Sequence, residues 1–160
     1  MNRVTILRLD ETFSDWDGLL SLIWQSFASM HGRIDPPSSA TALTGEALQR
    51  RAGNEIGFLA VEDRKLAGCI FCRPESQSLY IGKLAVLPGL QGKGIGRQLL
   101  AAAEAVALRR NLAVLRLETR IELAENHATF AAWGFVKTAE NTHSGFTRTT
   151  SIEMQKRLAP

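Results

Sequence analysis

The sequence is short of the residues that build metal centres and disulfide frameworks. Its 160 residues include two cysteines and three histidines, and neither type forms the paired pattern of a zinc site. Cys69 and Cys72 lie in an apolar, strand-like run, where side chains at that spacing point to opposite faces. We therefore predict two buried thiols, no disulfide between them and no bound metal.

Long apolar runs and concentrated charge are also missing. No stretch approaches the roughly 18 apolar residues of a membrane span, and the first residues lack the apolar core of a signal peptide. We therefore expect a cytoplasmic protein without a membrane partner. A net charge of +3, with no basic stripe among aromatics, does not favour nucleic acid as a partner. The length predicts one globular domain over residues 1–160.

Two well-known phosphate-binding loops are absent as well. The dinucleotide fingerprint G-x-G-x-x-G fails because Arg97 stands where the third glycine is needed. The P-loop fails because Lys93 is followed by Gly94, so that no hydroxyl is placed for Mg²⁺. A nucleotide-binding domain of either type is therefore a poor interpretation.

What the chain does contain is a glycine-rich turn between an apolar run, Leu79–Leu87, and a helix-like run, Ile95–Arg110. The turn reads Gln91, Gly92, Lys93, Gly94, Ile95, Gly96. Unpaired N–H groups and the positive end of the macrodipole lie at a helix start, and glycines let a phosphate approach the backbone. With Lys93 and Arg97 adding charge, we predict a bound diphosphate. The alternative is a connection whose glycines serve turn geometry only.

The hydrophobic pattern predicts a mixed order of strands and helices. Strands are expected over Val4–Leu9, Ile56–Glu62, Lys65–Arg73, Leu79–Leu87, Ala113–Thr119, Phe135–Thr138 and Phe146–Lys156. Helices are expected from Ser14 to about Met30 and over Thr41–Ala52, Ile95–Arg110 and Glu125–Trp133. The apolar character of both faces of Leu79–Leu87 places that strand at the centre of a sheet.

Three motifs together resemble the GNAT acetyltransferase superfamily. They are Leu84-Ala85-Val86-Leu87-Pro88, the Q-x-x-G-x-G loop after it, and Ala132-Trp133-Gly134-Phe135. The resemblance covers essentially the whole chain and implies a single α+β domain of three layers. It implies a mixed, mostly antiparallel sheet of about seven strands, helices on both faces and splayed central strands. It also implies an enzyme that moves an acetyl group from acetyl-CoA to an amine without a metal.

The resemblance assigns cofactor contacts to matching positions. Leu84, Ala85 and Val86 match the strand whose backbone pairs with the pantetheine arm, and Gln91 to Gly96 with Arg97 match the pyrophosphate cradle. A backbone N–H near Val86 would then face the thioester oxygen and stabilise negative charge there. The family often has an asparagine on the later helix, so Asn126 is carried over as a cofactor ligand. The alternative is an N-cap.

Glu118 is the first candidate for the base that takes the amine proton. Leu117-Glu118-Thr119-Arg120 resembles the Leu-Glu-Val-Arg of the N-terminal ribosomal-protein acetyltransferases, where the glutamate is assigned this role. The alternative is a structural ion pair with Arg116 or Arg120. Tyr80 is the second candidate, and its alternative is a core aromatic with a satisfied hydroxyl.

The chain departs from the family at Phe130, where many members carry the tyrosine that protonates the leaving thiolate. A thiol with a cysteine-like pKa of about 8.5 is a tolerable leaving group near pH 7, so transfer stays feasible. Phe130 is then expected to pack against the cofactor arm. The missing acid keeps a second hypothesis in view, a non-catalytic acyl-CoA-binding module.

Other features leave the acceptor and the partners open. His31, His127 and His143 are expected at surface or capping positions. The loops Met30–Ala40 and Glu140–Gly145 vary with substrate in the family, and their mixed charges do not choose between a small amine and a peptide. A homodimer is also left open.

Overall fold

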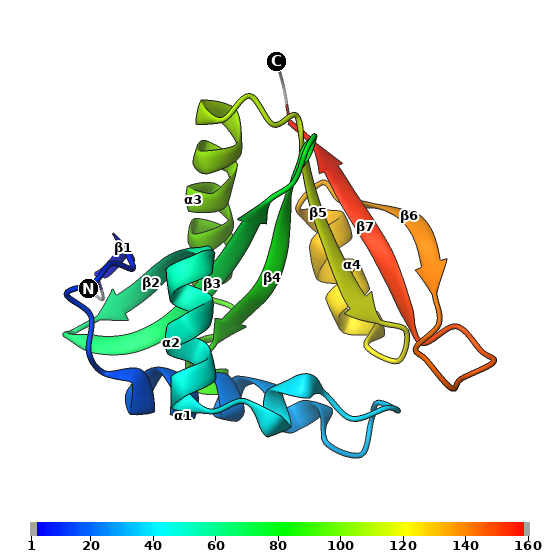
Figure 1. Cartoon of the computed structure of the whole chain (residues 1–160), viewed down its shortest axis with the longest axis horizontal. Helices are drawn as coiled ribbons and strands as arrows, with labels where there is room; N and C mark the ends of the chain where they lie inside the picture. Colours follow the sequence, from blue (N-terminus) through cyan, green and yellow to red (C-terminus); the bar gives the residue numbers. More distant parts are fainter. Residues whose placement is uncertain (1–2, 159–160) are drawn as a thin grey trace.

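One seven-stranded sheet organises the protein (Figure 1), of which the computed structural model describes residues 3–158. The strands are β1 (Val4–Arg8), β2 (Ile56–Glu62), β3 (Lys65–Pro74), β4 (Ser78–Val86), β5 (Val114–Arg120), β6 (Val136–Asn141) and β7 (Ser151–Arg157). The α-helices are α1 (Trp16–Phe27), α2 (Gly45–Asn54), α3 (Ile95–Arg109) and α4 (Ala124–Ala132). Short 3₁₀ segments occupy Ala28–Met30, Ser39–Ala42 and Pro88–Leu90.

The sheet has the order β1-β2-β3-β4-β5-β7-β6, so β4 is its central strand. Neighbouring strands are antiparallel except β4 and β5, which run parallel. A parallel pair needs a long crossover, and α3 supplies it between β4 and β5. The α+β class and the mixed, mostly antiparallel sheet predicted from the sequence are confirmed.

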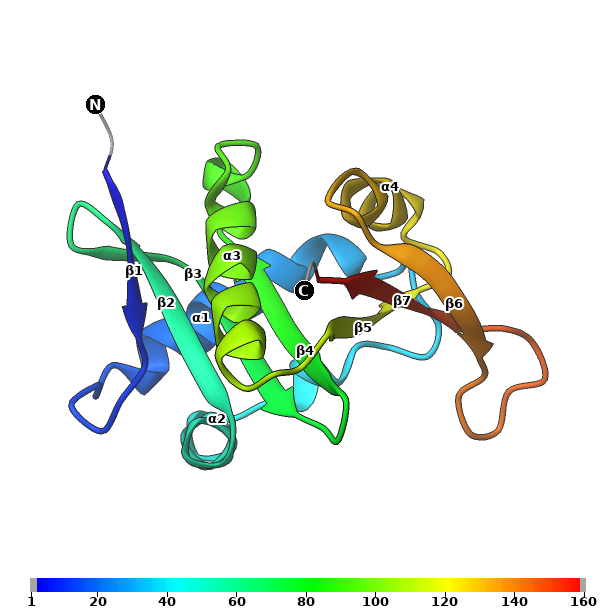
Figure 2. The same cartoon turned by 90° about the horizontal axis from the view of Figure 1, so that it is seen from above.

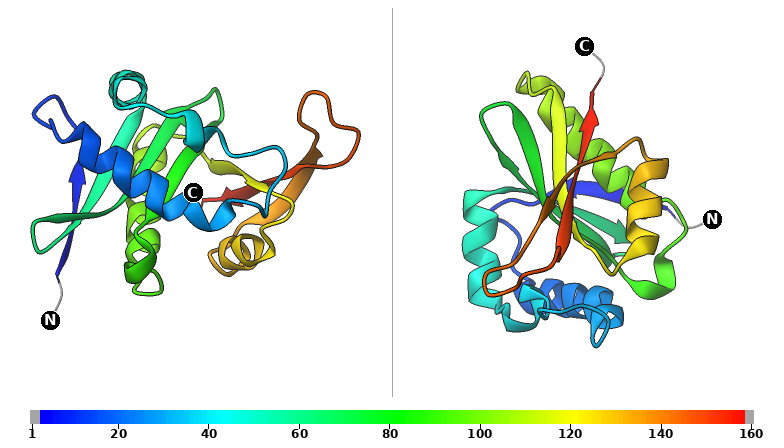
Figure 3. Two further views of the ribbon diagram at one scale, coloured as in Figure 1. Left: turned by 90° about the horizontal axis from the view of Figure 1, so that it is seen from below. Right: turned by 90° about the vertical axis from the view of Figure 1, so that its right-hand side faces the viewer.

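Helices cover both faces of the sheet and make three layers (Figure 3). One buried cluster joins α1 and α2 to one face, with Leu19, Ile23 and Leu48 fully buried. The other cluster joins α3 to the opposite face through Leu99 and Ala103, both fully buried. Figure 2 shows α3 over the half formed by β1 to β4 and α4 over the half formed by β5 to β7.

Both cysteines lie in these cores, as expected. Cys69 belongs to the cluster under α1 and α2, and Cys72 belongs to the cluster under α3. Burial raises the pKa of each thiol to about 12, so neither forms a thiolate at neutral pH. Within residues 3–158, no three His, Cys, Asp or Glu side chains gather as a metal-binding cluster. No helix in that part of the chain is long and apolar enough to span a membrane.

Three predicted element starts differ from the observed ones by two residues or more, and side-chain capping explains two of them. The first helix begins after Asp15, which accepts from Gly18 N–H at 3.1 Å, and not at Ser14. The second begins after Thr44, which accepts from Ala47 N–H at 3.1 Å, because residues 39–42 form a separate 3₁₀ turn. The last strand begins at Ser151 because residues 146–150 belong to the loop before it.

Candidate active site

The central strands β4 and β5 pair over only half their length. Ser78–Ile81 lies beside Val114–Leu117, although β4 continues to Val86 and β5 to Arg120. Gly82 marks the point of separation, because β3 pairs Cys72 with Ile81 and Phe71 with Lys83 and so passes over Gly82. Such a bulge bends its strand, and the two strands diverge from this point (Figure 1). The predicted splay is confirmed, and it begins where the bulge lies.

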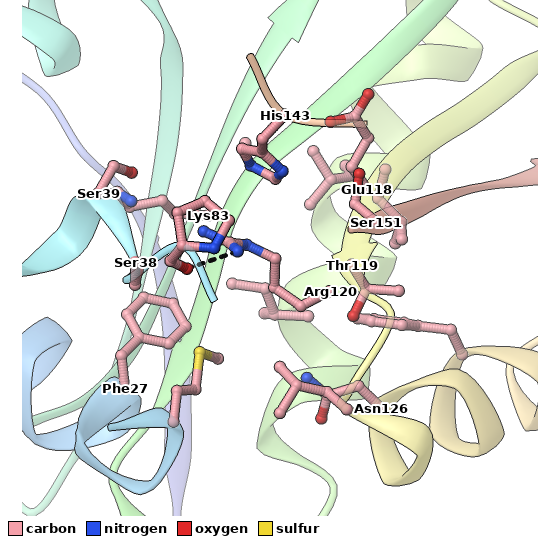
Figure 4. A pocket seen from close by; sticks show the side chains of 18 of the residues that line it. Phe27, Ser38, Ser39, Lys83, Glu118, Thr119, Arg120, Asn126, His143 and Ser151 are labelled. Carbon is pink, nitrogen blue, oxygen red and sulfur yellow. Dashed lines mark hydrogen bonds between the residues drawn. The ribbon is translucent and has the colours of Figure 1, made fainter. Parts of the chain in front are cut away.

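A cavity of about 400 Å³ lies where the strands diverge. Residues of β4, β5, α4, the end of α1 and the segment 36–39 line it. Figure 4 shows Phe27, Ser38 and Lys83 on one side and Glu118 and Thr119 on the other. β4 and β5 thus contribute residues to opposite sides of the cavity, and α1, α4 and the segment 36–39 complete its lining.

The second half of β4 presents a free backbone edge to this opening. Leu87 N–H donates to Ala67 O at 2.9 Å, so the backbone N–H of this residue points toward β3. Because backbone groups alternate along a strand, the N–H groups of Leu84 and Val86 point the other way, toward the gap. Val86 O is already occupied, since Ser26 Oγ donates to it at 3.0 Å and Gln91 Nε2 at 3.1 Å. Gln91 thus stabilises the turn through its side chain.

The glycine-rich turn continues from this edge into the start of α3. Gly92 and Gly94 adopt φ values of 82° and 84°, in the left-handed region that favours glycine. Gly94 is the N-cap of α3 and has no side chain to cap it. Gln98 N–H donates to Gly94 O at 3.1 Å, which is the first helical hydrogen bond. The N–H groups of Ile95, Gly96 and Arg97 therefore precede the first helical bond.

Charge and space at this turn suit an anion. Lys93 and Arg97 are exposed, and neither forms an ion pair with another of the described residues 3–158. A Cβ built on Gly92 or Gly94 meets nothing within 4 Å, so the backbone there is open to a ligand. Gly96 differs, because its Cβ would come within 3.2 Å of the Trp133 ring. It permits close packing of α3 on α4.

Glu118 is the exposed residue of the part of β5 that borders the cavity. Leu115, Leu117 and Thr119 alternate with it and are buried, and Leu117 and Thr119 border the cavity as well. The Glu118 side chain is 41% exposed and lies 4.0 Å from Arg116 Nη1. Asn141 Nδ2 donates to it at 3.3 Å. Both contacts are long, so most of the carboxylate's capacity to accept hydrogen bonds is free.

Tyr80 lies at the closed end of the opening, between two guanidinium groups. The centre of its ring is 4.9 Å from Arg73 Cζ and 4.4 Å from Arg116 Cζ. Burial, followed by the charge of Glu118, raises the pKa of the phenol. A phenol with a raised pKa stays protonated at neutral pH, so Tyr80 carries a proton there, whereas the carboxylate of Glu118 has only two long contacts.

Two residues of α4 complete the wall of the cavity. Phe130 borders the cavity and makes edge contacts with Trp133 and Phe135, with 5.8 Å between ring centroids in each pair. Asn126 borders it as well (Figure 4). The N-cap position of α4 belongs to Leu123. The N-cap alternative for Asn126 is therefore wrong.

The loop between α1 and α2 closes one side of the cavity. Arg120 donates to Pro36 O at 2.7 Å and to Pro37 O at 3.1 Å. Asp35 N–H donates to Glu122 Oε2 at 3.1 Å, and Arg148 Nη2 donates to Asp35 O at 2.9 Å. Arg120 is thus engaged with the loop, and its proposed pairing with Glu118 does not occur.

A model of the acetyltransferase (GNAT) family matches residues 16–135. The chain belongs to this family. It is therefore a GNAT acetyltransferase, and the opening between β4 and β5, with the glycine turn beyond it, lies within the matched region. No curated protein sequence matches the chain.

Solved structures share the fold of this GNAT acetyltransferase at low sequence identity. The PaiA N-acetyltransferase of Thermoplasma acidophilum, in complex with coenzyme A, is 18% identical with a TM-score of 0.80, over 97% of this chain and 99% of that one. The ribosomal-protein-S18-alanine N-acetyltransferase of Escherichia coli is 20% identical with a TM-score of 0.73, over 99% and 96%. A GNAT acetyltransferase of Elizabethkingia anophelis with acetyl-CoA bound is 20% identical with a TM-score of 0.67, over 97% and 98%.

Two cavity residues of this GNAT acetyltransferase were missed or misjudged from the sequence. Lys83 borders the cavity, and its signal was visible as a lone charge inside an apolar strand. His143 also borders it, with Thr150 Oγ1 bonded to both its backbone N–H and its Nδ1. His143 is thus half-buried and held by Thr150 at the cavity, whereas His31 is exposed and His127 Nε2 bonds Arg120 O at 2.8 Å.

Proposed function

We propose that this GNAT acetyltransferase binds acetyl-CoA along β4 and transfers the acetyl group directly to a primary amine of a small molecule or peptide. The observation that carries the proposal is the second half of β4, which β5 leaves unpaired and which a short 3₁₀ turn connects to the open start of α3. The amides of a pantetheine arm can bond the backbone of Leu84 to Val86. A diphosphate can accept from the first N–H groups of α3 beside Lys93 and Arg97.

The residues of the cavity supply what direct transfer requires. As the amine nitrogen bonds to the thioester carbon, negative charge develops on the carbonyl oxygen, and a backbone N–H of Leu84 or Val86 can donate to it. Glu118 takes the proton that the amine loses. The C–S bond then breaks and the thiolate departs, with Phe130 packed against the arm and donating no proton. Coenzyme A complexes of two structural neighbours support the choice of cosubstrate.

The test combines binding with turnover. Calorimetry should show acetyl-CoA binding, and a thiol-release assay with amino acids, peptides, polyamines and aminoglycosides should identify at least one acceptor. Mass spectrometry of the product should show one added acetyl group on nitrogen. Absence of acetyl-CoA binding would overturn the proposal.

The second candidate is a non-catalytic acyl-CoA-binding module, and Phe130 in the position of the usual acid is what favours it. Acetyl-CoA binding without thiol release from any acceptor would select this candidate. A single domain over residues 1–160, a cytoplasmic location and action without a metal remain predictions, and a homodimer remains open.

A further inference from the structure

One wall of the cavity carries a cation that the described part of the protein leaves unpaired. Lys83 is partly buried on β4. Within residues 3–158, no ion pair within 4.0 Å and no hydrogen bond reaches its Nζ. Lys83 Nζ lies over the Phe27 ring, 5.6 Å from its centroid. An ammonium group withdrawn from water without an anion is unfavourable, and such groups gather at functional sites.

The nearest charges do not neutralise Lys83. Glu55 is the acid close to it, but Glu55 Oε2 lies 3.6 Å from Arg51 Nε. These two side chains border Gly82, where a Cβ would lie 3.5 Å from Glu55 Oε1 and 3.8 Å from Arg51 Nη1. The Arg51–Glu55 pair has no net charge, so these three side chains together keep one positive charge, at Lys83. Burial, followed by the charge of Arg51, lowers the pKa of Lys83, and a bound anion would act in the opposite direction.

Hydroxyl groups on the same side of the cavity can extend an anion site. Ser38 and Ser39 border the cavity beside Lys83 (Figure 4). Ser38 Oγ accepts from Ala40 N–H at 3.1 Å, so its own proton is available to a ligand. Glu118 borders the opposite side. One side of the cavity is thus suited to an anion and the other to an amine.

We propose that the acceptor is an amine that also carries a carboxylate, as an amino acid does, and that Lys83 binds this carboxylate. The inference rests on the proposed function, because it names the acceptor class for the same cavity. An acceptor with two charged ends would place its amine toward Glu118 and its carboxylate toward Lys83 and Ser38. A polyamine would instead bring a second cation toward Lys83, where no free acid receives it.

The experiment compares acceptors that differ only in the carboxylate. Thiol release from acetyl-CoA is measured with α-amino acids, β-alanine and dipeptides, each beside its neutral amide, and with spermidine. If the carboxylate of the acceptor forms a charge-assisted hydrogen bond with Lys83, the best carboxylate-bearing acceptor should have a kcat/KM roughly 10- to 100-fold higher than the matching neutral amide. The dipeptides distinguish a free amino acid from a peptide as the source of the carboxylate.

Variants then assign the preference to Lys83. Lys83→Met should raise the KM of the carboxylate-bearing acceptor and so remove its advantage over the amide, while acetyl-CoA affinity stays unchanged. Lys83→Arg should restore part of the advantage. The matched control is Lys65→Met, at the exposed first residue of β3, which should leave the turnover of both acceptors unchanged. A melting curve for each variant shows that it is folded.

The outcomes separate this inference from the proposed function. Equal turnover of acids and amides, preference for spermidine, or an unchanged preference in Lys83→Met would each overturn the inference while the acetyltransferase activity stands. A loss of acetyl-CoA affinity in Lys83→Met would assign the lysine to the cofactor and also overturn it. Acetyl-CoA binding without thiol release from any acceptor would overturn both.

Discussion

At the scale of single residues, the chemistry depends on how few partners the cavity side chains have. Glu118 has two long contacts, of 3.3 Å and 4.0 Å, so its carboxylate can accept a proton from a ligand. Arg116, by contrast, donates to both oxygens of Glu75, at 3.0 and 2.8 Å. Two neighbouring charged residues of β5 thus have different roles, and their contacts distinguish them.

Glu118→Gln tests the proposed base, since it keeps the shape of the side chain and removes the basic oxygen. Loss of a general base lowers the rate by roughly 10²- to 10⁴-fold, so kcat near pH 7 should fall in that range with acetyl-CoA affinity preserved. Part of the rate should return at high pH, where more of the acceptor is free amine. The exposed Glu46 provides the control, and Glu46→Gln should leave kcat and acetyl-CoA affinity unchanged. Normal turnover of Glu118→Gln at every pH would make Glu118 structural and would leave Tyr80 or a water chain as the base.

Substitutions at Phe130 test the departure from the family pattern, in which a tyrosine is common at this position. Truncation to leucine removes ring contacts on the cavity wall, so Phe130→Leu should weaken acetyl-CoA binding by about 1–2 kcal/mol, or roughly 5- to 30-fold, in calorimetry. Phe130→Tyr restores the common residue, and it should keep or raise the turnover rate. If Phe130→Leu changes neither affinity nor turnover, the side chain does not touch the cofactor.

At the scale of elements, one irregular strand creates the site. The bulge at Gly82 ends the pairing of β4 with β5 at Ile81 and Leu117. The freed half of β4 then leads through a short 3₁₀ turn into α3. The edge of a strand and the start of a helix both offer unpaired N–H groups, so one continuous stretch of backbone can serve the arm and the diphosphate.

Gly94→Glu tests the helix-start site. The substitution places a side chain and a negative charge where a diphosphate would bind, so acetyl-CoA binding should be lost in calorimetry while the melting temperature falls little. Gly94→Ala is the matched control, because it imposes the same strain at a φ of 84° without the charge. The alanine variant should bind much more tightly than the glutamate variant. A folded Gly94→Glu protein with unchanged affinity would contradict a diphosphate site here.

At the scale of the whole molecule, a few polar contacts hold the two halves of the opened sheet at a fixed separation. Arg116 on β5 bonds Glu75, in the turn before β4, and its Nη1 lies 3.4 Å from Glu153 Oε2 on β7. At the open end, Arg120 on β5 bonds the loop that follows α1. The width of the cavity therefore depends on these contacts as well as on the bulge.

Arg116→Met should lower stability in a pH-dependent way. The hydrogen bond from Arg116 lowers the pKa of Glu75 in the folded state. A lowered folded-state pKa contributes stability above the unfolded value, about 4.3 for a glutamate, and that contribution is lost as the pH falls through the folded pKa. Both side chains are partly exposed, so we expect a loss of about 1–2 kcal/mol at pH 7 in urea unfolding.

The difference between Arg116→Met and the wild type should shrink as the pH is lowered below about 4.3. The control is Lys137→Met, which removes an exposed ion pair with Glu140 and should change stability little at any pH. A loss in Arg116→Met that is equally large in acid would show that packing, and not the Glu75 contact, accounts for it.

The sequence by itself determined the elements and the chemistry of the backbone site. Ile56–Glu62 was predicted at its observed bounds, and the helix predicted from Ile95 to Arg110 ends one residue earlier, at Arg109. Alternation and helical spacing are local properties, so nearest neighbours along the chain fix them. The left-handed glycines of the turn are local as well, so the residues themselves indicated where the backbone would adopt positive φ.

Only the tertiary structure decided what surrounds the acceptor. Lys83 on β4, Glu118 on β5, His143 after β6 and the Pro36 region after α1 are distant in sequence. They share one cavity because a bulge opens the sheet and a loop held by Arg120 closes one side. No spacing rule connects such residues, since their proximity arises from strand order and from side-chain contacts between distant segments. For this reason the glycine-rich turn could be singled out from the sequence, whereas only the folded protein places Lys83 and Glu118 around one cavity.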